Sequence, residues 1–202
     1  LEATHIRYAL DIQDKLGVVN LEHCISGTLY PDSRYITGID RDLTHPEDLL
    51  YTDPAKLTDF QKGWRAHLLC DNAMRQVTKN ELPEIFDAPD KQDVWVRLTA
   101  LKILQDIDDA KQFPLKNYLP YLDYTENPNG ENTAEILKFN KIFQTLYAEP
   151  EKLEISSYNI MLQESHIEES LASKIITQSA EYQNNERIML FVQTCYQKML
   201  SI

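Results

Sequence analysis

The chain reads Phe60-Gln-Lys-Gly-Trp-Arg-Ala-His-Leu-Leu-Cys-Asp-Asn-Ala-Met74 in its most informative stretch. Each helical residue turns the chain by about 100°, so residues three or four positions apart share a face. One face of this helix carries Phe60, Trp64, His67, Asp71 and Met74. A carboxylate on an apolar face needs a partner, and a divalent cation is one partner that would offset its loss of hydration. The stretch therefore predicts a helix that carries metal ligands.

Helical periodicity continues along most of the chain. The expected helices cover residues 3–16, 21–29, 54–78, 91–112, 133–147, 165–182 and 184–200. The first ends at Gly17, a common C-terminal signal. Residues 33–53 read as an irregular loop, because they are rich in turn-forming Gly, Pro and Asp. With only 5 glycines, the sequence disfavours a turn-rich β architecture. We therefore expect an all-α, multi-helix globular bundle.

The domain organisation follows from a change in composition. Asn127-Pro-Asn-Gly130 is the strongest loop signal. Four of the five histidines and both tryptophans precede it, and simple amphipathic patterns follow it. We expect one all-helical domain over residues 1–202, with a site-bearing part at about 1–126 and packing helices at about 131–202.

The charge and the motifs exclude several function classes. The formal net charge is -12, and no cluster of Lys and Arg is present, so duplex nucleic-acid binding is not expected. A phosphoester hydrolase stays compatible with this charge if a metal ion reverses the local field. Glycine-rich phosphate loops and the G-x-S-x-G motif of serine hydrolases are absent from the sequence.

The cysteines and the hydropathy indicate a cellular location. Three cysteines at wide spacing form no disulfide framework, which favours a reducing compartment. The sequence contains no apolar run long enough for a transmembrane segment. We therefore expect a cytoplasmic protein, and the missing initial Met leaves open a trimmed leader.

Three further residues join His67 and Asp71 as candidates. His5 lies on the apolar side of the first expected helix. Asp32 follows Pro31, where a helix-terminating turn or an N-cap is the simpler interpretation of this string alone. His45 lies in the long loop and by itself would be a solvated histidine.

An acidic cluster on the expected helix 91–112 is a weaker candidate. It contains Asp106, Asp108 and Asp109, of which only Asp108 leans toward the apolar side. Asp108 could orient a histidine ligand. A solvated acidic face is the simpler interpretation of the cluster.

Together the candidate residues suit the binding of a transition metal. Imidazole nitrogen and carboxylate oxygen without thiolate favour zinc, with manganese or iron as alternatives. The ligands His5, Asp32, His45, His67 and Asp71 would suffice for one metal, or for two bridged by an aspartate. An open position would hold a metal-activated water as nucleophile, and Asp32 would be its general base.

The order of these residues resembles a known family. His5, Pro31-Asp32, His45 and Gly63-Trp-x-x-His67-x-x-x-Asp71 are similar to the metal ligands of bacterial zinc-dependent phospholipases C and single-strand-specific zinc nucleases. The resemblance covers about residues 1–75. It implies an all-helical fold, zinc ligation by these five residues, and Asp32 as general base. It also implies a small-molecule or lipid phosphoester as substrate.

The sequence also departs from that family. Its members carry a further histidine and a glutamate after the aspartate, and a tryptophan at the amino terminus. Here Asn-Ala-Met-Arg-Gln-Val follows Asp71, and the next histidine is His166, which reads as a surface residue. Two hypotheses remain open: a phosphoester hydrolase with one or two metals, and a non-catalytic helical binding or scaffold protein that keeps the fold without the full site.

Overall fold

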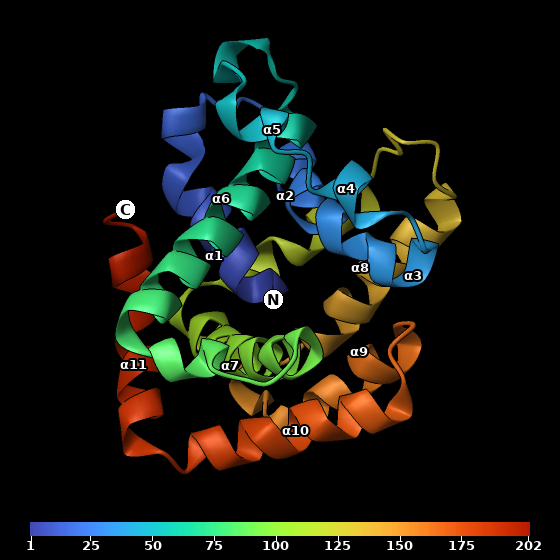
Figure 1. The fold of residues 1–202 in the computed structure, drawn as a ribbon. Helices are drawn as coiled ribbons and strands as arrows, with labels where there is room; N and C mark the ends of the chain where they lie inside the picture. Colours follow the sequence, from blue (N-terminus) through green and yellow to red (C-terminus); the bar gives the residue numbers. More distant parts are fainter.

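The computed structural model describes residues 1–202 as helices joined by short turns, without a β-strand (Figure 1). The α-helices are α1 (Glu2–Leu16), α2 (Leu21–Leu29), α3 (Arg34–Thr37), α4 (Arg41–Thr44), α5 (Asp48–Tyr51), α6 (Asp59–Glu81), α7 (Lys91–Gln112), α8 (Thr133–Leu146), α9 (Asn159–Glu164), α10 (Glu169–Gln183) and α11 (Glu186–Met199). The all-α expectation is confirmed. None of these helices combines the length and the apolar character that crossing a membrane requires.

Several expected boundaries were wrong. Residues 33–53 contain the short helices α3, α4 and α5 instead of an irregular loop. Pro54 begins a separate 3₁₀ turn, and α6 begins only at Asp59. The reason is a capping box: the Thr58 side chain accepts from the Gln61 backbone N–H, and the Gln61 side chain accepts from the Thr58 N–H. These reciprocal bonds fix the start of α6 independently of the proline.

Helices α2 and α6 cross at two glycines. A Cβ atom on Gly63 would lie 1.8 Å from the Cys24 carbonyl oxygen, and one on Gly27 would lie 2.0 Å from the Phe60 carbonyl oxygen. The two backbones are therefore in direct contact, and only glycine fits at either position. The crossing brings the backbone of α2 against the face of α6 that carries His67.

One large core joins the front and rear parts of the chain. It comprises 40 buried residues, from Ala3 in α1 to Met199 in α11. Helix α7 runs through the middle of the molecule, with α1 and α6 on one side and α10 on the other (Figure 1). A smaller cluster surrounds Trp64 and Tyr30 near the start of α6. The first turn of α1 is buried in the interior, so its side chains reach the centre of the fold.

Replacing Gly63 with Ala should destabilise the fold strongly. Helix propensity alone would stabilise such a variant by about 0.5–1 kcal/mol. The clash with Cys24 should reverse that sign and lower the free energy of unfolding by at least about 2 kcal/mol. Urea denaturation checks this, with Gln76→Ala on the exposed side of α6 as the control. A Gly63→Ala variant as stable as the parent would contradict the close crossing.

Candidate metal centre

His67 is fully buried and has one free ring nitrogen. Its Nδ1 lies 2.9 Å from the carbonyl oxygen of Thr28 on α2. A carbonyl oxygen can only accept, so Nδ1 carries the proton and Nε2 presents a lone pair. Nε2 is buried without any hydrogen-bond partner. This is the arrangement of a metal-ligating histidine, whose second nitrogen donates to a carbonyl or carboxylate.

His45 is held in a similar way. The Trp64 Nε1–H donates to the Thr44 carbonyl oxygen at 2.6 Å and ties the end of α4 to α6. The Thr44 hydroxyl donates to the Arg41 carbonyl oxygen at 3.2 Å and lies 2.9 Å from His45 Nδ1. Because the Thr44 hydroxyl donates its only proton to Arg41, its oxygen accepts from the Nδ1–H of His45. The lone pair of His45 Nε2 therefore remains free. The His45 and His67 ring centroids are 5.6 Å apart.

Two triads of side chains could hold a metal ion. The outer triad comprises Asp32, His45 and His67, and the inner triad comprises Glu2, His5 and His67. In each triad the ligand atoms all lie within 4.8 Å of one another. Both triads need the single free nitrogen of His67. They are therefore alternative positions for one cation and not two halves of a two-metal site.

A chain of hydrogen bonds links the residues of the inner triad to Asp71. Glu2 Oε2 lies 3.4 Å from His5 Nδ1, and His5 Nε2 lies 3.3 Å from Asp71 Oδ1. Burial and repulsion from Asp32 raise the pKa of Glu2 well above its usual value, which favours the protonated form of Glu2. In that form Glu2 donates to His5 Nδ1, which leaves His5 Nε2–H to donate to Asp71. A cation in the inner triad would first have to displace the Glu2 proton.

A cation that binds to the outer triad would not have to displace a proton. Burial would raise the pKa of Asp32, but attraction to His67 and Lys102 outweighs it and lowers the pKa to about 2. Burial, with repulsion from His67, lowers the pKa of His45 to about 4. At neutral pH the triad thus offers a carboxylate and neutral imidazoles, the forms that bind metals. These protonation states favour the outer triad.

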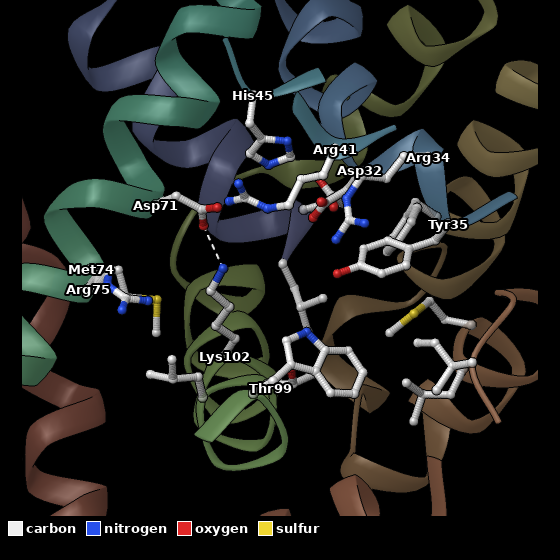
Figure 2. Close-up of a pocket in the computed structure, with 18 of the residues that line it drawn as sticks. Asp32, Arg34, Tyr35, Arg41, His45, Asp71, Met74, Arg75, Thr99 and Lys102 are labelled. Carbon is white, nitrogen blue, oxygen red and sulfur yellow. Dashed lines mark hydrogen bonds and ion pairs between the residues drawn. The ribbon is translucent and has the colours of Figure 1, made fainter. Parts of the chain in front are cut away.

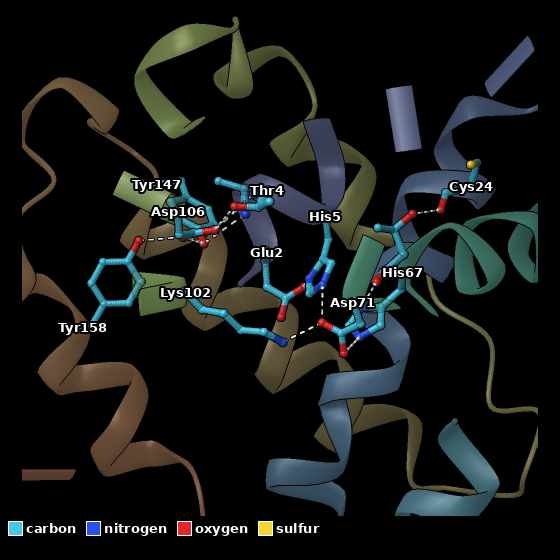
Figure 3. Close-up of polar contacts among 12 residues, drawn as sticks. Glu2, Thr4, His5, Cys24, His67, Asp71, Lys102, Asp106, Tyr147 and Tyr158 are labelled. Carbon is cyan, nitrogen blue, oxygen red and sulfur yellow. Dashed lines mark hydrogen bonds and ion pairs between the residues drawn. The ribbon is translucent and has the colours of Figure 1, made fainter. Parts of the chain in front are cut away.

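Asp71 lies between the two triads and belongs to neither. Its Oδ2 is 3.8 Å from His67 Nε2, and its Oδ1 accepts from Lys102 Nζ at 2.5 Å (Figure 3). Burial would raise the pKa of Asp71, but the charge of Lys102 and the hydrogen bond from His5 lower it well below its usual value. Asp71 is therefore an ionised group that a cation bound to His67 would approach closely.

The buried carboxylate of Asp106 holds the first turn of α1 in place by hydrogen bonds. Asp106 accepts from the hydroxyls of Tyr147 and Tyr158 at 2.5 and 2.6 Å, and from the Thr4 backbone N–H at 3.1 Å. Our prediction of a solvated acidic face was wrong here, because Asp106 and Asp109 are fully buried while Asp108 is partly exposed. Asp106 thus fixes the turn that presents Glu2 and His5 (Figure 3).

The site opens into a cavity of about 220 Å³. Asp32, His45 and Asp71 line one end of it, and Lys102 points toward them from α7 (Figure 2). Phe139 and other apolar side chains also line the cavity. Phe139 belongs to α8, so the rear part of the chain contributes to the pocket as well as to the packing.

All five residues expected at the site surround this locus. The structure brings Asp32, His45 and His67 into one triad, His5 into the other, and Asp71 between them. Sequence reasoning missed Glu2 and Lys102. Glu2 lies three residues before His5, and a helical i, i+3 search around each histidine would have found it. Lys102 gave no comparable signal, since its partner lies 31 residues away.

No family model, curated protein or solved structure matches the chain. The resemblance to zinc phospholipases C and nucleases therefore rests on the residues named above, and the family stays a prediction.

Elemental analysis of variants should locate the cation. We expect close to one equivalent of a transition metal in the purified chain, and almost none in His67→Gln, which removes the nitrogen common to both triads. Asp32→Asn should lose the metal, whereas Glu2→Gln and the surface control His166→Gln should keep it. The reverse result for Asp32→Asn and Glu2→Gln would place the ion in the inner triad. A metal-free parent protein, purified without chelator, would contradict both triads.

The stability of the chelator-treated protein should fall as the pH is lowered from about 6.5 to about 4. Unfolded histidines bind protons near pH 6.5, whereas the folded pKa of His45 is about 4 and those of His5 and His67 are also lowered. The unfolded state therefore holds more protons throughout this window, so acid favours unfolding. Urea denaturation at several pH values checks this, and His45→Gln should show a shallower slope than His166→Gln. A constant unfolding free energy would contradict the assignment of neutral buried rings.

Proposed function

We propose that the chain is a metal-dependent hydrolase of phosphoesters, similar in chemistry to zinc phospholipases C and zinc nucleases. The observation that carries this proposal is the buried Nε2 of His67, which has a fixed lone pair and no partner. A buried nitrogen acceptor without a partner is costly, and a cation would satisfy it. Zinc is the expected ion, with manganese or iron as alternatives.

The outer triad has the composition of a catalytic site. Three protein ligands, here two imidazoles and a carboxylate, leave a fourth position open on zinc, as in zinc hydrolases. Asp32 and His45 line the cavity, so that position would face a bound substrate. When bound, the cation would lower the pKa of a coordinated water and neutralise charge on the phosphoryl group.

The side chains around the triad have distinct roles in this proposal. Asp32, with a pKa of about 2, suits ligation better than general-base catalysis, which works best with a pKa near the operating pH. His5 and Lys102 hold Asp71 in place by direct hydrogen bonds. In the reaction, the water oxygen forms a new bond to phosphorus while the bond to the leaving oxygen breaks. One proton of the water ends on the leaving alcohol.

A second candidate function follows from Lys102. Its ammonium already neutralises Asp71 at 2.5 Å, so part of the polar cluster is satisfied without a metal. This contact favours a non-catalytic helical binding or scaffold protein, in which the histidines have a structural role. The two functions differ in metal content and in turnover.

Zinc-loaded protein should hydrolyse chromogenic phosphoesters, and chelation should abolish that activity. We expect His67→Gln and His45→Gln to reduce kcat/KM by at least about a hundredfold, because changing only a residue that hydrogen-bonds to a metal ligand already costs about 10–100-fold. His166→Gln should behave like the parent. Release of 4-nitrophenol from mono- and diester substrates measures this. Metal binding without turnover of any phosphoester would support the non-catalytic alternative.

A further inference from the structure

The cavity beside the outer triad has a charged end and an apolar end. Trp95, Leu98, Phe139, Phe143 and Leu162 belong to its apolar lining. With about 220 Å³, the cavity is smaller than the roughly 300–1,000 Å³ of pockets that enclose a drug-sized ligand. It therefore suits a small ligand with one polar and one apolar group.

Three of the residues that line the cavity are arginines without carboxylate partners. Arg34, Arg41 and Arg75 line the cavity and form no ion pair. Elsewhere in the chain, Arg7 and Arg187 pair with carboxylates at 2.7 Å, and Arg65 and Arg97 donate to backbone carbonyl oxygens. Acidic residues outnumber basic ones by 32 to 20, so unpaired arginines gathered at one cavity indicate a site for an anion.

Arg34 is the most constrained of the three. Its guanidinium carbon lies 4.1 Å from the centre of the Tyr35 ring, which holds the planar group in one orientation. Its Nε is buried and has no hydrogen-bond partner. Figure 2 shows Arg34 and Arg41 on the same side of the cavity as Asp32. A planar guanidinium matches two oxygens of a phosphate group.

The net charge around the cavity distinguishes between phosphate monoesters and phosphate diesters as ligands. Lys102 and the three arginines supply four positive charges, and a divalent cation would add two. Glu2, Asp32 and Asp71 supply at most three negative charges. The excess is therefore at least three positive charges with the metal bound. A phosphate monoester carries about −1.5 to −2 charges at pH 7, whereas a diester carries only one.

We propose that this cavity binds the dianionic phosphate of a small monoester whose organic group is apolar. Arg34 and Arg41 bind the phosphate oxygens, and the apolar wall around Trp95 contacts the organic group. The inference rests on the proposed hydrolase function for its reaction, but its binding step can be measured separately.

Binding of phenylphosphonate by calorimetry at pH 8 tests the recognition step without turnover. We expect the dianion to bind at least about tenfold more tightly than its monomethyl ester, which has a single charge. Arg34→Gln and Arg41→Gln should each lose about tenfold in affinity for the dianion. Arg97→Gln is the matched control, because Arg97 lies outside the cavity and donates to the Glu84 carbonyl oxygen. Equal affinity for phenylphosphonate and its monomethyl ester would overturn the inference. So would equal affinities of Arg34→Gln, Arg41→Gln and Arg97→Gln for the dianion.

Hydrolysis by the zinc-loaded protein separates this inference from the function on which it rests. We expect 4-nitrophenyl phosphate to be a better substrate than bis(4-nitrophenyl) phosphate, with the preference reduced in Arg34→Gln. Metal-dependent turnover that favours the diester would overturn the inference and leave the hydrolase proposal intact. Arginine-dependent binding of phenylphosphonate without hydrolysis of either ester would support the inference about the ligand and contradict the hydrolase proposal.

Discussion

The direct backbone contact between α2 and α6 is the constraint on which the candidate site depends. Gly27 and Gly63 allow the two helices to touch, and the contact brings the Thr28 carbonyl oxygen to His67 Nδ1. That hydrogen bond selects the tautomer and leaves Nε2 free. One turn earlier on α6, Trp64 ties down the end of α4 and thus the position of His45. A single stretch of helix therefore places one ligand directly and another through its neighbour.

Sequence reasoning predicted the long helices, because they follow from helical spacing, and it placed His67 on the buried face of α6. Metal ligation by His67 stays a prediction. It failed where the outcome depends on distant partners. Asp106 looked solvated among other acidic residues, yet its partners Tyr147 and Tyr158 lie 41 and 52 residues away. The start of α6 was misplaced for a local reason, since the Thr58 capping box took precedence over the proline signal. The family resemblance and the identity of the metal stay predictions.

The overall charge of the chain conceals a local field of opposite sign. A net charge of -12 argues against a long polyanion as a partner, yet the cavity beside the outer triad is lined by Arg34, Arg41, Arg75 and Lys102. These residues come from α3, α4, α6 and α7, so no window of the sequence shows them as a cluster. Only the fold brings the basic side chains together at the end of the cavity where the acidic and histidine side chains converge.

The carboxylate of Asp106 joins the beginning of the chain to segments far beyond it. Thr4 in α1 and the tyrosines at the end of α8 and before α9 donate to the same group. A fragment that stopped before α8 would lose both tyrosine donors and leave a buried anion poorly satisfied next to the first turn of α1. The amino-terminal third carries most of the candidate ligands, but the tyrosines that hydrogen-bond Asp106 lie outside it. Their geometry therefore depends on contacts between the front and the rear segments of the chain.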